Sequence, residues 1–212
     1  MKTINSILET LKTRTAALVV PSAVVFAIVS FLGTSQQANA QAWGKSSKVL
    51  TLGVGVSNYH HLDGYYYGDP DRIRRAYVPT TGMLVFQGEF GVHKYVGLGF
   101  HTGFGGRGRW SRDYVGGWHV PVGMLTNFHF YQLIADNTSR NIHADVLDIY
   151  AGLSLGTGVA VSYFGDGTVR GVPLLYGGPH VGIRWYFAPA VGLTAELGYG
   201  KNVASAGFVF KL

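Results

Sequence analysis

Five polar side chains could form a charged site, because each lies in a stretch where large apolar residues occupy every second position. They are Glu89, His101, Arg184, Glu196 and Lys211. Successive side chains of a β-strand point to opposite faces, so all five fall on the polar faces of their strands. Acids and bases that share a face can form an ion gate, or a paired network that fills an interior. We expect the network, because unpaired buried charge is costly.

Arginine and aromatic residues alternate in two longer stretches, "DGYYYGDPDRIRRAY" and "GGRGRWSRDY". The candidate binding residues in them are Arg72, Arg74, Arg75, Arg107, Arg109, Trp110 and Arg112. A guanidinium group matches phosphate oxygens in a forked geometry, so these loops could bind lipopolysaccharide phosphates or glycans. We expect an ordinary solvated loop whose Tyr and Trp rings form an aromatic girdle at a membrane interface, and keep binding as the alternative.

The stretch "VSNYHHLD" offers Ser57, His60, His61 and Asp63, which are residue types used in hydrolysis and metal binding. Adjacent histidines on an extended segment point in opposite directions, so we expect no metal here. The chain has no cysteine, which excludes thiol catalysis and Cys-ligated zinc. We therefore expect no catalytic residue, metal or cofactor, and keep an enzyme acting on envelope lipid as an alternative.

Alternation with a period of two predicts an all-β protein in which eight strands position these side chains. The expected strands cover residues 49–59, 83–92, 95–104, 118–130, 145–156, 177–187, 191–200 and 204–212. Each is close to the length that crosses a bilayer when tilted, and eight is an even number, as bacterial outer-membrane barrels require. The polar faces are rich in glycine, which suits a narrow interior.

The first 40 residues are predicted to be a secretory signal peptide, because a basic start precedes an apolar run over 16–33. Ala38 and Ala40 form an A-x-A site, so cleavage is expected after Ala40. A retained membrane anchor is the alternative. Residues 41–47 would then be a short periplasmic segment before a barrel over 48–212.

The orientation of the two faces is decided by three observations. An export signal is present, only 13% of residues are charged, and the polar faces carry groups such as Glu89 and Arg184 that a dry core would not accommodate. We therefore predict an eight-stranded antiparallel transmembrane β-barrel with its apolar face towards lipid. Residues 1–40 carry three basic and one acidic residue, so the net charge of +6 falls to +4 without them, a mild excess that does not indicate nucleic-acid binding.

The predicted connections mostly alternate between long and short, as expected for a barrel whose N-terminus is periplasmic. Long loops are expected near 57–79, 105–117 and 160–172, and short turns at 91–94 and 188–190. The connection over 131–144 is longer than this rule predicts, and the one near 201–205 is shorter. Arg184 and Glu196, on consecutive strands, are expected to lie nearly opposite each other.

The stretch "GGPHVGIRWYFAPAVGLTAELGYG" (177–200) and the terminal "GFVFKL" resemble the small outer-membrane β-barrel family of the OmpA/OmpX type. The resemblance extends loosely over 48–212. It implies an outer-membrane location in a Gram-negative bacterium, contact with outer-membrane lipid, and recognition of the C-terminal strand by the barrel assembly machinery. Strands of that kind usually end in Phe, whereas this chain ends in Leu212.

The function expected from the sequence is a structural or surface-interaction role for a monomeric barrel with a plugged, charged lumen. A narrow pore for small solutes is the first alternative, because the charges on the polar face could also select ions. The fold alone does not choose among these functions.

Overall fold

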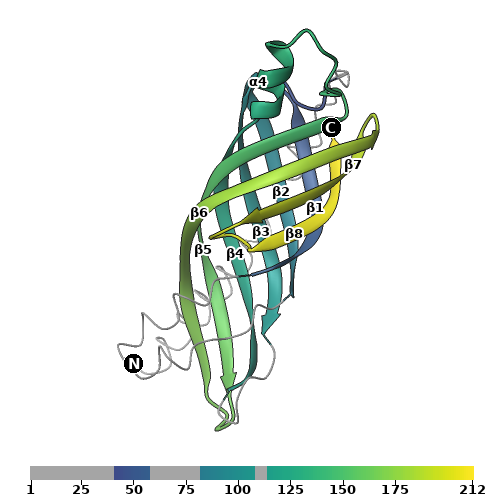
Figure 1. Ribbon diagram of the computed structural model, residues 1–212. Helices are drawn as coiled ribbons and strands as arrows, with labels where there is room; N and C mark the ends of the chain where they lie inside the picture. Colours follow the sequence, from purple (N-terminus) through teal and green to yellow (C-terminus); the bar gives the residue numbers. More distant parts are fainter. Residues whose placement is uncertain (1–40, 58–81, 108–113) are drawn as a thin grey trace, which may run out of the picture. The chain divides into compact units, whose positions relative to one another are not determined.

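The computed structural model describes residues 41–57, 82–107 and 114–212, and these form a closed barrel of eight antiparallel strands (Figure 1). The elements are β1 (Lys48–Val56), β2 (Gly82–His93), β3 (Val96–Arg107), β4 (Tyr114–Phe128), α4 (Phe130–Asp136), β5 (Leu147–Phe164), β6 (Val169–Ala188), β7 (Val191–Gly198) and β8 (Ala204–Lys211). Each strand pairs with its sequence neighbour, and β1 pairs with β8 to close the barrel. The predicted fold class is confirmed.

The strands form because large apolar side chains occupy every second position and point away from the barrel axis. Leu84, Met124 and Leu155 all lie outward, and Met124 is 72% exposed. Their neighbours in sequence point inward, where Gln87 and Glu89 are buried. This pattern is the reverse of a water-soluble barrel, whose apolar side chains face inward.

The two ends of the barrel differ. The start of β1, the β2–β3 and β6–β7 turns, helix α4 and the end of β8 lie at one end, which we call the α4 end. The β5–β6 and β7–β8 turns follow strands that run towards the opposite end, which we call the far end (Figure 1). No helix among the described residues is long and apolar enough to cross a membrane.

Strands β5 and β6 are much longer than predicted, with 18 and 20 residues. The long loop expected over 160–172 is wrong, because the two strands stay paired as far as Tyr163 and Val169. Thr157 interrupts the apolar signal of β5 at an outward position, but the alternation continues, since Leu155 and Val159 still point outward. The connection over 131–144 contains α4, which explains its length.

The hairpin β7–β8 is short, with 8 residues in each strand. Strand β6 pairs with β7 only between His180 and Ala188. Within the described part of the chain, residues 169–178 of β6 therefore have β5 on one side and no strand on the other. The paired β5 and β6 strands extend well past β7–β8 at the far end.

Inward glycines make room for the large side chains that fill the barrel. A Cβ atom at Gly182 would overlap with the ring of Tyr150, and one at Gly97 would overlap with the carboxylate of Glu89. Glycine on the polar face therefore leaves space for specific neighbours rather than for an open channel.

Candidate functional site: a layered lumen

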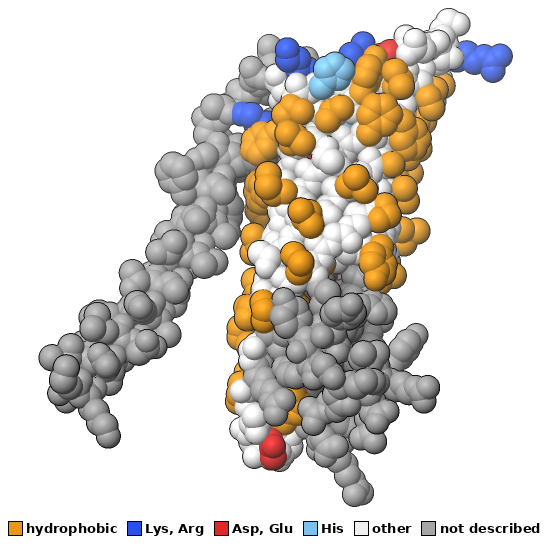
Figure 2. Space-filling model, turned by 90° about the vertical axis from the view of Figure 1, so that its left-hand side faces the viewer, with side chains coloured by type: hydrophobic (Ala, Val, Ile, Leu, Met, Phe, Trp, Pro, Cys, Tyr) orange, Lys and Arg blue, Asp and Glu red, His pale blue; other side chains and the backbone are white. Residues whose placement is uncertain are grey.

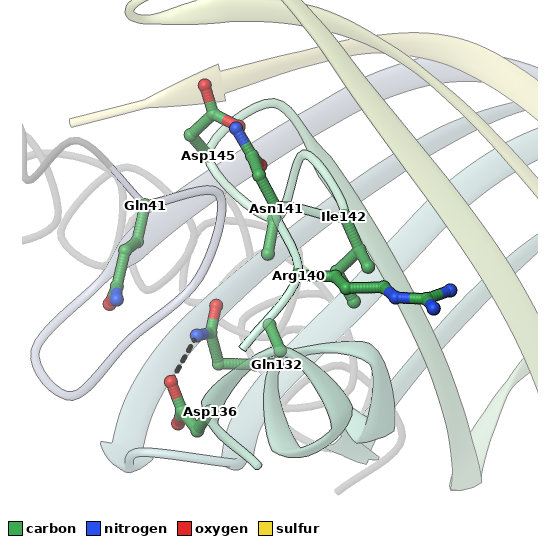
Figure 3. A pocket seen from close by; sticks show the side chains of 9 residues that line it. Gln41, Gln132, Asp136, Arg140, Asn141, Ile142 and Asp145 are labelled. Atoms are coloured by element: carbon green, nitrogen blue, oxygen red, sulfur yellow. Dashed lines mark hydrogen bonds between the residues drawn. The ribbon is translucent and has the colours of Figure 1, made fainter. Parts of the chain in front are cut away.

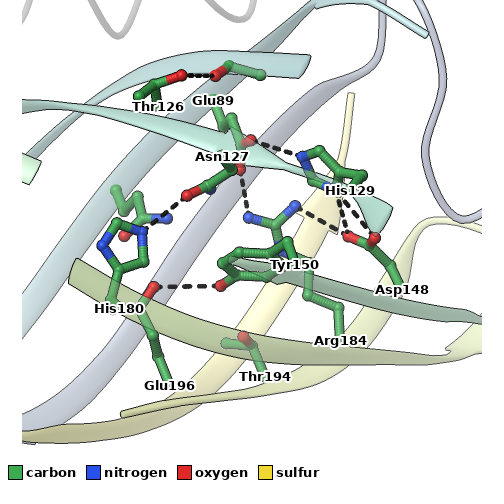
Figure 4. A network of polar contacts seen from close by, with 12 residues as sticks. Glu89, Thr126, Asn127, His129, Asp148, Tyr150, His180, Arg184, Thr194 and Glu196 are labelled. Carbon is green, nitrogen blue, oxygen red and sulfur yellow. Dashed lines mark hydrogen bonds and ion pairs between the residues drawn. The ribbon is translucent and has the colours of Figure 1, made fainter. Parts of the chain in front are cut away.

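A closed ring of four charged side chains crosses the lumen near the α4 end (Figure 4). His129 contacts Asp148 through Nδ1 at 2.9 Å and Glu89 through Nε2 at 2.9 Å. Arg184 contacts Asp148 through Nη1 at 3.4 Å and Glu89 through Nη2. Each carboxylate therefore bridges the same two bases, and all four side chains are buried.

The ring is electrically balanced. A carboxylate accepts hydrogen bonds but does not donate them when ionised, so both nitrogens of His129 must carry protons to satisfy both partners. His129 is then a cation, and two cations face two anions. Such a closed arrangement offsets much of the desolvation cost that any one of these charges would carry alone.

Aromatic rings cover this charge ring on two sides. Trp43 stacks on His129, with ring centroids 3.6 Å apart, and Tyr150 lies under the Arg184 guanidinium at 4.4 Å. Trp43 comes from the segment before β1, which was predicted only as a short periplasmic segment. It is fully buried at the α4 end, where it packs with Val49 and Tyr186.

A second cluster joins Glu196 to the loop between β7 and β8. Lys201 Nζ lies 2.8 Å from a carboxylate oxygen of Glu196 and donates to Gln87 Oε1 at 2.7 Å. The Tyr150 hydroxyl donates to Glu196 at 3.2 Å. Lys201 was not among the predicted site residues because it lies outside the alternating pattern, in a connecting loop.

The expected pairing of Arg184 with Glu196 is therefore wrong. In the observed register Arg184 lies opposite Thr194, and Glu196 lies opposite Gly182. The β6–β7 hairpin brings the two strands together, but their register places Arg184 and Glu196 two residues apart along the strands. Each then finds a partner from elsewhere: Glu89 and Asp148 for Arg184, and Lys201 for Glu196.

The remaining predicted lumen residues, His101 and Lys211, lie inward but away from the ring. His101 Nε2 is 2.7 Å from the Tyr176 hydroxyl, and a similar pair joins His180 to Asn127 at 2.7 Å. Lys211 Nζ donates to the Gln41 carbonyl oxygen at 2.7 Å and lies 4.1 Å from the Tyr186 ring centroid. It therefore fastens the N-terminal segment at the α4 end.

Strand β2 shows that these clusters form successive layers. Its inward side chains from the α4 end are Glu89, Gln87, Val85 and Met83. Glu89 belongs to the charge ring and Gln87 to the Glu196–Lys201 cluster. Val85 and Met83 belong to an apolar cluster with Ala160, Leu174 and Tyr176 towards the far end.

A cavity of about 390 Å³ opens beside α4 (Figure 3). Its lining residues are Gln41, Gln132, Ala135, Asp136, Arg140, Asn141, Ile142, Ala144 and Asp145. Asp136 is bound by Lys94 Nζ at 2.8 Å and by the Gln132 amide at 3.0 Å. Partial burial acts to raise the pKa of Asp136, but these two donors hold it below its usual value. The hydrogen bond to Asp136 in turn raises the pKa of Lys94.

Several predicted site residues lie outside the described residues: Arg72, Arg74, Arg75, Arg109, Trp110 and Arg112, together with His60, His61 and Asp63. Arg107 ends β3, and its side chain is also outside the description. Ser57, the potential nucleophile, is fully buried. Within the described ranges, no group of three His, Cys, Asp or Glu residues could hold a metal ion.

Figure 2 shows one face of the barrel, on which hydrophobic side chains are spread along the wall and most charged side chains lie near one end. The exposed residues include Leu52, Leu98, Ile183, Leu197 and Phe208, from five different strands. Aromatic pairs lie on this surface too: Trp118 Nε1 donates to the Tyr163 hydroxyl at 3.1 Å, and Trp185 packs edge-on against Phe187. A contiguous apolar surface of this extent requires an apolar environment.

The N-terminal β-barrel domain of OprF from Pseudomonas aeruginosa has the same architecture. It matches 80% of this chain and 99% of its own length, with a TM-score of 0.50 and 12% sequence identity. The fold is that of a small outer-membrane β-barrel.

Two further solved barrels align less closely. Neisserial surface protein A matches 84% of this chain and 100% of its own, with a TM-score of 0.48 and 14% identity. Ail, the attachment invasion locus protein of Yersinia pestis, matches 80% of this chain and 95% of its own, with a TM-score of 0.41 and 14% identity. No family model and no curated protein matches the sequence.

Proposed function

We propose that this chain is an outer-membrane barrel of a Gram-negative bacterium with a closed lumen and a structural or surface-interaction role. The observation that carries the proposal is the combination of an apolar outer wall with a layered interior. Four consecutive inward positions of β2, from Glu89 to Met83, each contribute to a packed layer. Narrow eight-stranded barrels are generally filled by side chains.

The layers differ in how they oppose ion passage. Trp43 and Tyr186 close the α4 end with aromatic rings, and Leu174 and Tyr176 pack with Met83 in the apolar layer. Between them, the charges of Arg184 and Glu89 are already neutralised by partners. A permeating ion would have to displace these contacts and cross a layer that offers it few ligands.

The outer surface supports a role in contacts beyond the membrane. The β5–β6 pair continues past the end of β7–β8, and Val169 and Leu175 on it are more than half exposed. A membrane thickness of about 25 Å needs only about ten tilted residues per strand, so these 18- and 20-residue strands extend beyond it. Lipopolysaccharide remains the expected partner, and the Arg-rich stretches of the chain, whose arginine side chains lie outside the described residues, remain the candidates for binding it.

Single-channel recording tests the closed lumen. Protein exported and folded in cells is inserted in a planar bilayer, and its folded state is verified by its heat-dependent gel mobility. We expect no discrete current steps from the wild type. Trp43→Gly is the matched variant, because it removes the largest ring at the α4 end but leaves the apolar layer at Met83 in place. Stable, uniform steps from wild-type protein would contradict the proposal.

The alternative is a narrow pore, which the buried carboxylates favour. If steps are seen, Glu89→Gln and Asp148→Asn should reduce preference for cations, because both groups lie across the lumen. If the lumen conducts but the cation preference is unchanged in both variants, ions do not pass through the charge ring.

A further inference from the structure

Gln41 is held firmly against the α4 end of the barrel. Lys211 Nζ binds its carbonyl oxygen at 2.7 Å, and the next residue, Ala42, donates its N–H to the Ala144 carbonyl at 2.9 Å. Further along, Ser46 and Ser47 exchange backbone hydrogen bonds with Gly91 of β2. The backbone nitrogen of Gln41 is therefore near a fixed point of the fold.

Gln41 also lines the cavity beside α4 together with two carboxylates, Asp136 and Asp145 (Figure 3). Asp136 is already bound by Lys94 and Gln132. Asp145 adjoins the Ala42–Ala144 hydrogen bond. Among the described residues Lys211 lies close enough to interact with it electrostatically, but no salt bridge within 4 Å is formed. The Arg140 guanidinium points away from both Gln41 and Asp145 (Figure 3). The cavity thus contains a carboxylate that is available to a cation.

We propose that this cavity binds the chain's own amino terminus after the Ala40–Gln41 peptide bond has been hydrolysed. Water adds across that bond: Ala40 leaves as a carboxylate with residues 1–40, and the nitrogen of Gln41 becomes a primary amine. Such an amine is protonated below a pKa of about 8. The ammonium group pairs with Asp145, and its remaining hydrogens face a polar lining that includes Gln132 and Asn141, whose amide oxygen also accepts the His143 N–H at 2.9 Å.

This site connects processing to closure of the lumen, and it rests on the expected cleavage after Ala40. Gln41 is two residues from Trp43, whose indole covers His129. In the uncleaved chain the nitrogen of Gln41 is a neutral amide and has no charge to offer Asp145. Cleavage therefore adds a second tether, at the nitrogen, to the one that Lys211 provides at the carbonyl oxygen of the same residue.

Hydrogen exchange of residues 42–47, measured by mass spectrometry on folded protein, tests the proposal. The variants are Asp145→Asn, the matched cavity control Arg140→Gln, and Ala38→Asp, which blocks cleavage. An exposed ion pair changes an opening equilibrium by about 1.5- to 5-fold. We expect Asp145→Asn to speed exchange by that factor in processed protein, Arg140→Gln to leave it unchanged, and Asp145→Asn to have no effect when cleavage is blocked. Equal effects of Asp145→Asn in both forms, or none in either, would overturn the site.

Chemical reactivity of the new amine gives an independent measurement. An amine acylating reagent modifies only the unprotonated form, so pairing with Asp145 should slow modification of the Gln41 amine. Peptide mapping separates this product from modified lysines. We expect modification several-fold faster in Asp145→Asn than in wild type. Equal rates, or a processed chain that begins at another residue, would refute the proposal.

Discussion

Trp43 lies flat against His129, with their planes 7° apart. His129 also binds Glu89 and Asp148, so the segment before β1 contributes a side chain to the packed interior of the lumen. The indole shields one face of the charge ring from water. This contact makes the N-terminal segment a determinant of barrel stability.

Trp43→Ala should therefore destabilise the barrel. Truncating a fully buried tryptophan costs about 3–5 kcal/mol, and here it also exposes one face of a buried cation. Guanidinium unfolding in detergent micelles measures the change. Trp185→Ala is the matched control, because that indole points outward and is half exposed. Similar losses for the two variants would mean that Trp43 has no special role.

Arg184→Gln should cost about 3–5 kcal/mol, because it leaves two buried carboxylates with only His129 as a cation. The double variant Arg184→Gln/Glu89→Gln removes one acid and one base together, so it should be more stable than the single variant. Unfolding free energies of the four proteins form a double-mutant cycle. Additive losses would show that the two side chains do not act as a pair.

Glu196 should couple to Lys201 and not to Arg184. In cycles with Glu196→Gln, we expect an interaction energy of about 0.5–3 kcal/mol with Lys201→Met and nearly zero with Arg184→Gln. The difference follows from the 2.8 Å contact between Glu196 and Lys201 and from the stagger between β6 and β7. Stronger coupling to Arg184 would mean that the hairpin register is shifted.

Leu52→Arg tests the lipid-facing surface. Leu52 is the central residue of β1 and points outward, so an arginine there should cost about 2–4 kcal/mol in a bilayer. Val169→Arg, at the tip of β6, should cost about 0–1 kcal/mol because that position lies beyond the apolar band. Refolding equilibria into lipid vesicles measure both. Equal penalties would place Val169 within the membrane as well.

The Lys94–Asp136 ion pair at the α4 end should make a pH-dependent contribution to the stability of the folded protein. The pKa of Asp136 is lowered in the folded state, so the stabilisation is present above the unfolded Asp pKa of about 3.9 and is lost as the pH falls further. The pKa of Lys94 is raised, so the contribution is also lost when the pH rises past that of lysine. The free energy of unfolding of Lys94→Gln should differ from that of the wild type at pH 7 but not at pH 2. A difference that persists at pH 2 would assign the effect to packing.

Alternation was sufficient to predict the strands, because its period of two survives even where glycine replaces a polar residue. It also placed Glu89, Arg184 and Glu196 on the inner face. The end of β5 was missed for a local reason: Thr157, at an outward position, weakens the apolar signal without ending the strand.

The pairing of the charges could not be predicted, because it depends on the stagger between strands and on contacts across the lumen. Arg184 and Glu89 are 95 residues apart in sequence and meet only when the barrel closes. The sequence placed His129 and Asp148 on the polar faces of their strands, but no local feature predicts that they contact Arg184 and Glu89. Trp43 lies in a segment without periodicity, so its burial had no signal in the sequence.

The pairing of β1 with β8 has a consequence for how the chain reaches this structure. Val49 lies opposite Lys211, so β8 completes the ring that β1 begins. A contact of such long sequence separation is entropically expensive and slow to form. Until β8 is made, β1 has an unsatisfied edge that cannot be exposed to lipid. Closure must therefore follow synthesis of β8, and a chain truncated before Ala204 would have no route into the membrane as a closed barrel.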